Sequence, residues 1–317
     1  MIFVGGMPRS GTTLLTQLVG THPEIYSVPE ETRFIVDPDG VGELLESLTS
    51  GWAGPSVAGV RIQRFRKLML THLVDRDTDP YIDFCMYDYF DETLYRNAVE
   101  DFIGQLACCT FEGKAAASTE PGRYVPRWFP EETLVGLARQ FVSTLFGGQA
   151  QFDDKAIWCE KTPHNLVSPY PRKLFPDAHF LHAVRDPRDV AASIASDQTA
   201  HGSGAPGIWG TGSVGAALDW IHEYCRRWEA LAAGGRFDGI RMLQVDYEDL
   251  VRDPDATMAR VFAFVGVDPV EPDRWTEPLD ASAIGRHTTS FSKDDHVLFE
   301  ARVAPLWRRL FATADDS

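Results

Sequence analysis

Short apolar runs alternate with longer amphipathic segments along most of this chain. Four runs rich in β-branched and aromatic residues predict strands, at about residues 2–5, 155–158, 179–184 and 240–245. Apolar positions at three- and four-residue spacing predict helices, among them residues 97–109, 131–146 and 216–233. Strands that alternate with helices favour an α/β fold with a central, mainly parallel sheet flanked by helices. Because no repeat or low-complexity linker interrupts the chain, we predict a single domain over residues 1–317.

The first predicted strand runs into a glycine-bounded loop that opens directly into a helix. Residues 6–11 read G-M-P-R-S-G, so Gly6 and Gly11 keep the spacing of a phosphate-binding P-loop. Free backbone N–H groups and the helix dipole favour an anion there. Nucleoside triphosphatases need a lysine where this chain has Thr12, and a cation stands inside the loop as Arg9. The pattern therefore predicts a P-loop-like three-layer fold that binds an anion but is poorly suited to hydrolysing ATP or GTP.

Two further strands lead into helices through residues suited to ligand binding. The strand at 179–184 ends in Arg185, and Ser193 follows eight residues later on the next helix. The strand at 240–245 leads to Tyr247, ahead of a helix predicted over residues 254–265. Ligands of parallel sheets bind outside the carboxyl ends of the strands. We therefore expect the anion site to extend along these strand ends.

These segments resemble the sulfotransferases that use 3′-phosphoadenosine 5′-phosphosulfate (PAPS), most closely the tyrosylprotein sulfotransferase branch and its bacterial relatives. The resemblance rests on residues 8–14, on the H-P-E at residues 22–24 and on the E-E-T-R at residues 30–33. It implies PAPS as the donor, adenosine 3′,5′-bisphosphate as the product, and no metal.

The resemblance assigns donor-binding roles residue by residue. The first loop would hold the 5′-phosphosulfate, through Arg9, Ser10, Gly11, Thr12 and Thr13. Arg185 and Ser193 would bind the 3′-phosphate, and Tyr247 would contact the donor. Family members also close over the donor with a late loop, and residues 286–293 match that loop by position alone. Within it, Ser290 and Lys293 are candidate donor contacts.

The resemblance also implies the groups that would carry in-line sulfuryl transfer to a hydroxyl. The general base falls on Glu31, the second carboxylate of the E-E-T-R motif, whereas counting from Arg9 selects Glu30. Lys161 matches a lysine that stabilises the leaving oxygen, and Arg9 would share this task. His164 is a competing base, because other branches of the family use histidine.

The composition of the chain limits which binding partners are expected. The net charge of −16 disfavours nucleic acid and anionic membranes. Nine scattered histidines and five cysteines without a C-x-x-C pair indicate no metal site. With no leader and no long apolar span, we expect a cytoplasmic enzyme. The acceptor is expected to be a hydroxyl-bearing small molecule or peptide, and the sequence does not identify its class. A homodimer is possible, and the sequence does not decide the oligomeric state.

Two other functions remain to be weighed against sulfuryl transfer. A P-loop kinase for a small molecule would need a phosphate-binding lysine and a carboxylate for Mg²⁺, and Thr12 argues against it. A catalytically inactive nucleotide-binding protein would keep the loop alone, and the retained Glu31 and Lys161 argue against that.

Overall fold

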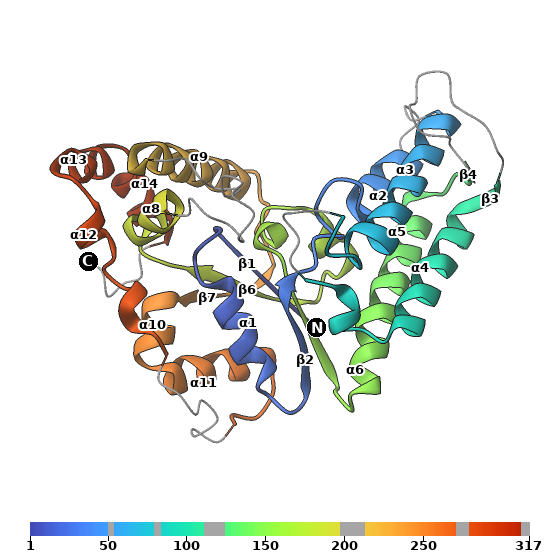
Figure 1. Cartoon of the computed structure of the whole chain (residues 1–317), viewed down its shortest axis with the longest axis horizontal. Coiled ribbons are helices and arrows are strands. Elements are labelled where there is room, and N and C mark those ends of the chain that lie inside the picture. The colour runs from blue at the N-terminus through green and yellow to red at the C-terminus, as the bar shows by residue number, and fades with distance from the viewer. Residues whose placement is uncertain (50–53, 79–83, 111–123, 197–212, 271–278, 312–317) are drawn as a thin grey trace. The chain divides into compact units, whose positions relative to one another are not determined.

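The computed structural model describes residues 1–49, 54–78, 84–110, 124–196, 213–270 and 279–311. Its main sheet has five strands in the order β2-β5-β1-β6-β7. The strand pairs β1–β6, β2–β5 and β6–β7 are all parallel. Helices flank this sheet (Figure 1), so the predicted α/β fold with a central, mainly parallel sheet is confirmed.

The described chain divides into two compact units. The first unit contains Met1, Pro23–Thr162 and Tyr170–Ala178, and the second contains Ile2–His22, Pro163–Pro169 and His179–Ser317. The single domain predicted over residues 1–317 stays a prediction. None of the described helices has the length and apolar composition that crossing a lipid bilayer requires.

The second unit is built on the parallel strands β1 (Ile2–Gly6), β6 (His179–Val184) and β7 (Arg241–Asp246). Its helices are α1 (Thr12–Gly20), α8 (Pro187–Ser196), α9 (Val214–Ala233), α10 (Tyr247–Arg252), α11 (Pro254–Val265), α12 (His287–Ser290), α13 (Lys293–Arg302) and α14 (Ala304–Phe311). Two short 3-10 turns, η4 (Pro163–Asn165) and η6 (Ala281–Ala283), complete it.

Side chains of β6 alternate between two helical layers of the second unit. His179 contacts Phe264 of α11, whereas His182 stacks on Trp228 of α9. This alternation follows from the two-residue period of a strand. Figure 1 shows α1 and α11 together on one side of these strands and α8, α9, α13 and α14 on the other. Both faces of the strands are therefore covered, which explains their continuous apolar runs.

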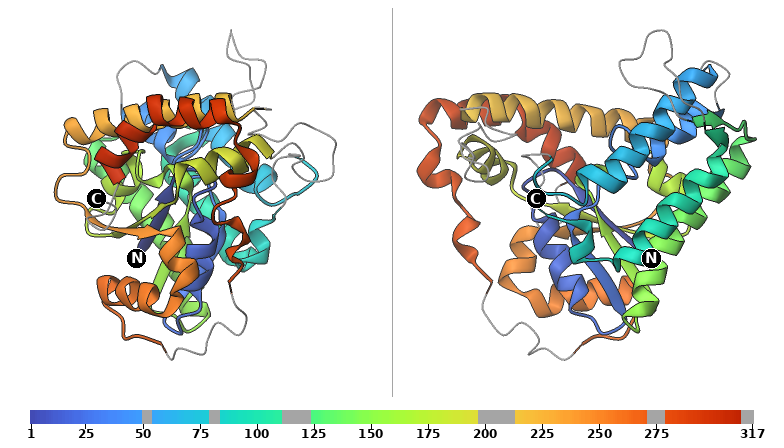
Figure 2. Two further views of the ribbon diagram at one scale, coloured as in Figure 1. Left: turned by 90° about the vertical axis from the view of Figure 1, so that its left-hand side faces the viewer. Right: turned by 45° about the vertical axis from the view of Figure 1, so that its right-hand side comes forward.

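The first unit pairs the parallel strands β2 (Ile25–Glu31) and β5 (Ile157–Lys161) with a helical layer. The layer comprises α2 (Val41–Thr49), α3 (Pro55–Lys67), the π-helix η1 (Leu68–His72), the 3-10 turn η2 (Met86–Asp88), α4 (Glu92–Leu106), α5 (Glu131–Val142), the π-helix η3 (Ser143–Gly147), α6 (Gly148–Phe152) and α7 (Tyr170–Leu174). A hairpin of β3 (Ala107–Thr110) and β4 (Tyr124–Pro126) is antiparallel. Figure 2 shows α3, α4 and α5 running alongside one another.

Aromatic rings form the core of the first unit. Phe102 and Phe141 stack at 4.6 Å between ring centroids, and Phe146 stacks on Trp158 of β5 at 4.9 Å. Phe34 contacts both Phe141 and Phe146, so it links the α5 side of the core to the η3 side. Aromatic pairs of this kind add to the stabilisation that burial alone provides. They connect the helical layer to β5, whose last residue is Lys161.

Candidate active site

The loop between β1 and α1 has a backbone that few residues tolerate. A Cβ at Gly6 would lie 2.4 Å from the carbonyl oxygen of Ala183, so only glycine lets β1 approach β6 there. Gly11 has a φ of 92°, and Arg9 adopts the left-handed region with a φ of 70°. A left-handed conformation costs a residue with a side chain roughly 1–2 kcal/mol. Backbone strain of this kind collects at functional sites.

Side chains of this loop contact residues that follow the carboxyl end of β6. Nε of Arg9 donates a hydrogen bond to Oγ of Ser193 on α8, at 3.0 Å. Nη1 of Arg185 donates to the carbonyl oxygen of Arg9 at 3.1 Å. The Arg185 guanidinium also lies over the Tyr247 ring, 4.6 Å from its centroid. The structure therefore brings together Arg9, Arg185, Ser193 and Tyr247, four of the residues proposed from the sequence to bind the donor.

Tyr247 also lies against the loop itself. A Cβ at Gly11 would fall 2.4 Å from Cδ2 of the Tyr247 ring. Gly11 is therefore required twice, for its positive φ and for the close approach of this ring. Tyr247 packs between the loop and Arg185, at the start of α10.

Two buried donors of this region have no hydrogen-bond partner among the described residues. They are Oγ of Ser10 and Nε of Arg185, whose side chains belong to residues only 1% and 6% exposed. Burial lowers the pKa of Arg185. A buried polar group without a partner costs about 1–3 kcal/mol. No side chain caps the N-terminus of α1 at Gly11, and the first N–H groups of a helix have no partner within the helix. Together these groups could hold an anion.

The late segment contributes a cation that our reading of the sequence did not select. Burial lowers the pKa of Arg185 and raises that of Tyr247, and the nearby charge of Arg286 acts to lower both. Ser290 donates instead to the carbonyl oxygen of Arg286 within α12, and Lys293 is exposed at the start of α13. The basic character of residues 286–293 was the signal in the sequence, but it did not indicate which of these residues lies near Arg185.

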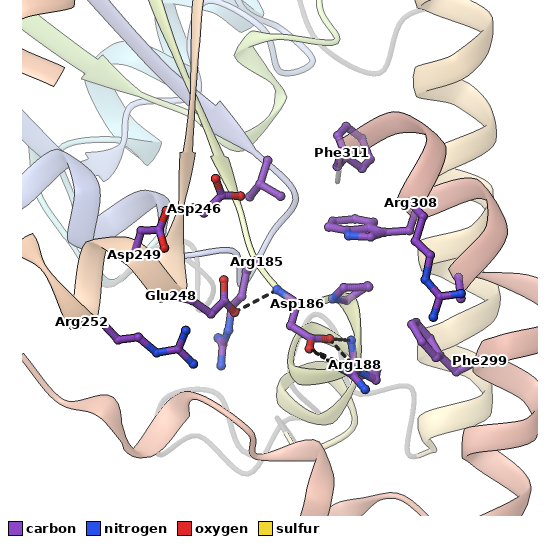
Figure 3. Close-up of a pocket in the computed structure, with 14 residues that line it drawn as sticks. Arg185, Asp186, Arg188, Asp246, Glu248, Asp249, Arg252, Phe299, Arg308 and Phe311 are labelled. Atoms are coloured by element: carbon purple, nitrogen blue, oxygen red, sulfur yellow. Dashed lines mark hydrogen bonds and ion pairs between the residues drawn. The ribbon is translucent and has the colours of Figure 1, made fainter. Parts of the chain in front are cut away.

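A cavity of about 420 Å³ lies beside Arg185 in the second unit. Figure 3 shows Arg185 and Glu248 on one wall and Phe299 and Arg308 on another. Asp186 holds Arg188 through its carboxylate, and its N–H donates to Glu248 at 3.0 Å. Burial raises the pKa of Glu248. The cavity is thus lined by charges of both signs and by aromatic rings.

His164 lies on η4, apart from these contacts. The side chain of the next residue, Asn165, donates to the carbonyl oxygen of Val4 at 2.9 Å and fixes η4 against β1. His164 itself is exposed. Its role as a base stays a prediction.

The first unit carries the proposed catalytic pair. Glu31 ends β2 and Lys161 ends β5, and the parallel register places them opposite each other. Nζ of Lys161 lies 3.9 Å from Oε1 of Glu31. The Lys161 side chain is 3% exposed and that of Glu31 is 40% exposed, so only the carboxylate is open to solvent. Burial lowers the pKa of Lys161, and the charges of Glu31 and Glu30 oppose this shift.

A buried carboxylate supports this pair from the opposite face of the strands. Glu160 is fully buried, and its Oε1 accepts hydrogen bonds from the hydroxyls of Thr32 at 2.5 Å and Thr162 at 2.7 Å. The backbone N–H of Arg33 donates to the Thr162 hydroxyl at 3.1 Å. Our reading of the sequence missed this network, although both threonines stand next to residues that it selected.

Glu30 and Glu31 have different partners. Tyr89 forms a side-chain hydrogen bond with Glu30, and the negative charge of Glu30 adds to the burial that raises the pKa of Tyr89. Tyr89 is fixed in turn, because its carbonyl oxygen accepts a hydrogen bond from the Tyr26 hydroxyl. Glu30 is therefore held by a phenol, while Glu31 faces Lys161.

Comparison with known proteins shows the family of this chain. The model of the Sulfotransferase family matches residues 2–272. Protein-tyrosine sulfotransferase 2 of Gallus gallus is 24% identical over 277 residues, which are 84% of this chain and 51% of that protein. Nodulation protein NoeE of Sinorhizobium fredii is 25% identical over 280 residues, 84% of this chain and 50% of that protein. The chain thus spans about half the length of these curated relatives.

Solved structures with a similar trace are also sulfotransferases. The sulfotransferase domain of the Synechococcus PCC 7002 olefin synthase aligns with 99% of this chain and 88% of that one, at 19% identity and a TM-score of 0.45. Sulfotransferase STF1 from Mycobacterium tuberculosis H37Rv aligns with 96% of this chain and 76% of that one, at 18% identity and a TM-score of 0.43.

Proposed function

Because this chain belongs to the Sulfotransferase family, we propose that it transfers a sulfuryl group from PAPS to a hydroxyl acceptor. The observation that carries the proposal is the pair of buried, unpartnered donors on Ser10 and Arg185. Their burial is costly unless an anion accepts from them. They lie in the same unit as the strained loop and the Arg286 charge, which suits a ligand with more than one phosphate.

In this proposal the donor is held by its two anionic ends. Ser10 and the N–H groups at the start of α1 would bind the 5′-phosphosulfate, with Thr12 and Thr13 beside them. Arg185, Ser193 and Arg286 would bind the 3′-phosphate. When bound, PAPS supplies a sulfuryl group on a phosphate leaving group.

The proposed chemistry assigns the base to Glu31. Its half-exposed carboxylate would take the proton of the acceptor hydroxyl as that oxygen bonds to sulfur. The bond between sulfur and the bridging phosphate oxygen breaks in the same in-line step. Lys161 would stabilise the negative charge that develops on this oxygen, with help from Arg9. The hydrogen bond between Tyr89 and Glu30 supports Glu31 over Glu30, because it occupies the other carboxylate.

Binding of three nucleotides tests the donor assignment. We expect calorimetry to show the tightest binding for adenosine 3′,5′-bisphosphate, weaker binding for adenosine 5′-monophosphate and the weakest for Mg·ATP. The missing P-loop lysine at Thr12 is the reason for the last of these. A preference for Mg·ATP, with phosphoryl transfer to a small molecule, would establish the kinase alternative instead.

Transfer itself is tested with ³⁵S-labelled PAPS and an extract of the producing cells. Mass spectrometry of the labelled products identifies the acceptor, whose class we leave open. Lys161→Ala and Glu31→Gln should bind the bisphosphate normally and lose transfer. Wild-type protein that binds the bisphosphate but labels nothing would favour an inactive nucleotide-binding protein. A cytoplasmic location, a homodimer and the absence of nucleic-acid partners stay predictions.

A further inference from the structure

A short C-terminal segment, residues 283–287, is fastened to the end of β6 and to α8 by side chains. Nη2 of Arg185 donates to the carbonyl oxygen of Ala283 at 2.5 Å. Asp189, on the first turn of α8, accepts from the backbone N–H of Gly285 at 2.7 Å and of His287 at 2.9 Å. It also accepts from Nδ1 of His287 at 2.7 Å. Residues more than 90 positions apart in sequence are thereby joined.

The carboxylate of Asp189 is occupied by hydrogen bonds to this segment. Asp189 is 1% exposed, and its two carboxylate oxygens accept three hydrogen bonds from residues 285 and 287. Asp186, Asp189 and His287 also offer atoms within 4.8 Å of one another, a spacing that a metal could use. However, Asp186 already accepts from Arg188, and Asp189 from N–H groups. The donor set therefore favours a hydrogen-bond anchor over a cation.

The anchored segment carries Arg286 between its two attachment points. Gly285 has a φ of 74°, a conformation that glycine adopts readily and that turns the chain ahead of Arg286. Arg286 is exposed, yet its charge acts on Arg185 and on Tyr247. Like charges repel, and Arg286 lies near enough to Arg185 for its charge to act on it. Such an arrangement needs an external constraint, and Asp189 is the group placed to provide it.

We propose that Asp189 is a positioning residue for the donor: by holding Gly285 and His287, it keeps the segment that carries Arg286 close to Arg185. This inference rests on the proposed function, because it takes the 3′-phosphate as the ligand of these two cations. Asp189 itself does not touch the ligand. Its contribution is selective, since it orders the 3′-phosphate cations and not the first loop.

The test compares two nucleotides that differ only in the 3′-phosphate. Affinities for adenosine 3′,5′-bisphosphate and adenosine 5′-monophosphate are measured by calorimetry on wild type and Asp189→Asn. An amide has one acceptor oxygen, and its NH₂ group would face N–H donors. We expect the preference for the bisphosphate to fall about tenfold or more, as loss of a charge-assisted contact implies. The affinity for the monophosphate should stay within about twofold, which a general loss of structure would not allow.

Asp186→Asn is the matched control, because it removes a carboxylate three residues away that holds Arg188 instead of the late segment. It should keep the nucleotide preference of wild type. Hydrogen–deuterium exchange adds a readout that needs no ligand. The amides of Gly285 and His287 should exchange faster in Asp189→Asn, while those of β6 stay protected.

The outcomes separate the inference from the proposed function. Wild type that binds neither nucleotide refutes the proposed function, and the inference with it. Wild type that prefers the bisphosphate, with the same preference in a folded Asp189→Asn, overturns the inference alone. If Asp189→Asn does not fold, the exposed replacement Arg286→Ala decides the question. Its preference should also fall about tenfold, and an unchanged preference would overturn the inference.

Discussion

Acidification should destabilise the second unit through His182. This residue lies in β6, is 3% exposed and stacks on Trp228 with ring centroids 4.4 Å apart. Phe311 of α14 covers its edge at 5.5 Å. Burial lowers the pKa of His182 from 6.5 to about 3. The folded protein therefore keeps this imidazole neutral at pH values where an unfolded chain would protonate it.

The sign and size of the effect follow from this difference. A depressed folded pKa gives stability that is complete above the unfolded pKa of 6.5 and is lost as the pH falls toward 3. Between pH 7.5 and 5.0 the unfolded chain takes up nearly one proton more than the folded one at this site. With 1.36 kcal/mol per pKa unit, the loss by pH 5.0 is about 2 kcal/mol. That is a large part of the stability of a typical domain.

His182→Phe should remove this loss while keeping an aromatic ring against Trp228. Urea unfolding followed by far-UV circular dichroism at pH 7.5 and 5.0 measures the change. We expect the drop in unfolding free energy to be about 2 kcal/mol smaller in the variant than in wild type. His179→Phe is the control on the same strand, and since His179 is partly exposed it should alter the drop less. Equal pH dependence in wild type and His182→Phe would refute the reasoning.

Three predictions concern the proposed site. Glu31→Gln should lower kcat by about 10²–10⁴-fold, and Glu30→Gln should lower it less; steady-state kinetics with labelled donor check this, and equal losses would contradict the assignment. Gly11→Ala places a methyl group 2.4 Å from the Tyr247 ring at a φ of 92°. Calorimetry should then show bisphosphate binding weakened by about tenfold or more, and unchanged affinity would argue against the loop as donor site. Thr162→Val removes one hydrogen-bond donor from the buried carboxylate of Glu160. Urea titrations should show an unfolding free energy that is lower by about 1–3 kcal/mol. A loss below about 0.5 kcal/mol would show that the carboxylate finds another donor.

Strongly periodic elements of the second unit were predictable from the sequence. The strand at His179–Val184 and the helix at Pro254–Val265 have the bounds that the pattern predicts. β2 was not predicted, because Pro29 and two glutamates end its apolar run. Its place at the end of the strand order explains why a proline is tolerated there.

Two predicted helices in the first unit have other bounds in the structure. The helix predicted over residues 97–109 is α4, Glu92–Leu106, and its expected last turn pairs instead with β4 as β3. The apolar stripe over residues 131–146 continues through the π-helix Ser143–Gly147, which a spacing of three and four residues cannot distinguish from an α-helix.

Within the candidate site, sequence reasoning selected Arg9, Arg185, Ser193 and Tyr247, which the structure brings together, but it did not predict how they pair. Spacing associated Ser193 with Arg185, yet the structure hydrogen-bonds Ser193 to Arg9. The contacts of Glu160 and Asp189 could not be predicted, because each joins segments about 100 residues or more apart. A buried acid is ordinarily unfavourable, so the partner hydroxyls of Glu160 and the N–H groups around Asp189 explain why these residues are tolerated.

Several departures from local rules lie at the carboxyl ends of the strands. Arg9 has a left-handed backbone after β1, Lys161 is a buried ammonium at the end of β5, and Ser10 is a buried donor without a described partner. Each lowers stability by itself, and none is needed to complete the core. Such groups are retained where they bind a charged ligand, because a fixed charge in a site that excludes water stabilises an anion more than a charge surrounded by water does. At Arg9 and Ser10 these departures coincide with the loop that the sequence pattern selected, and they support the proposed donor site.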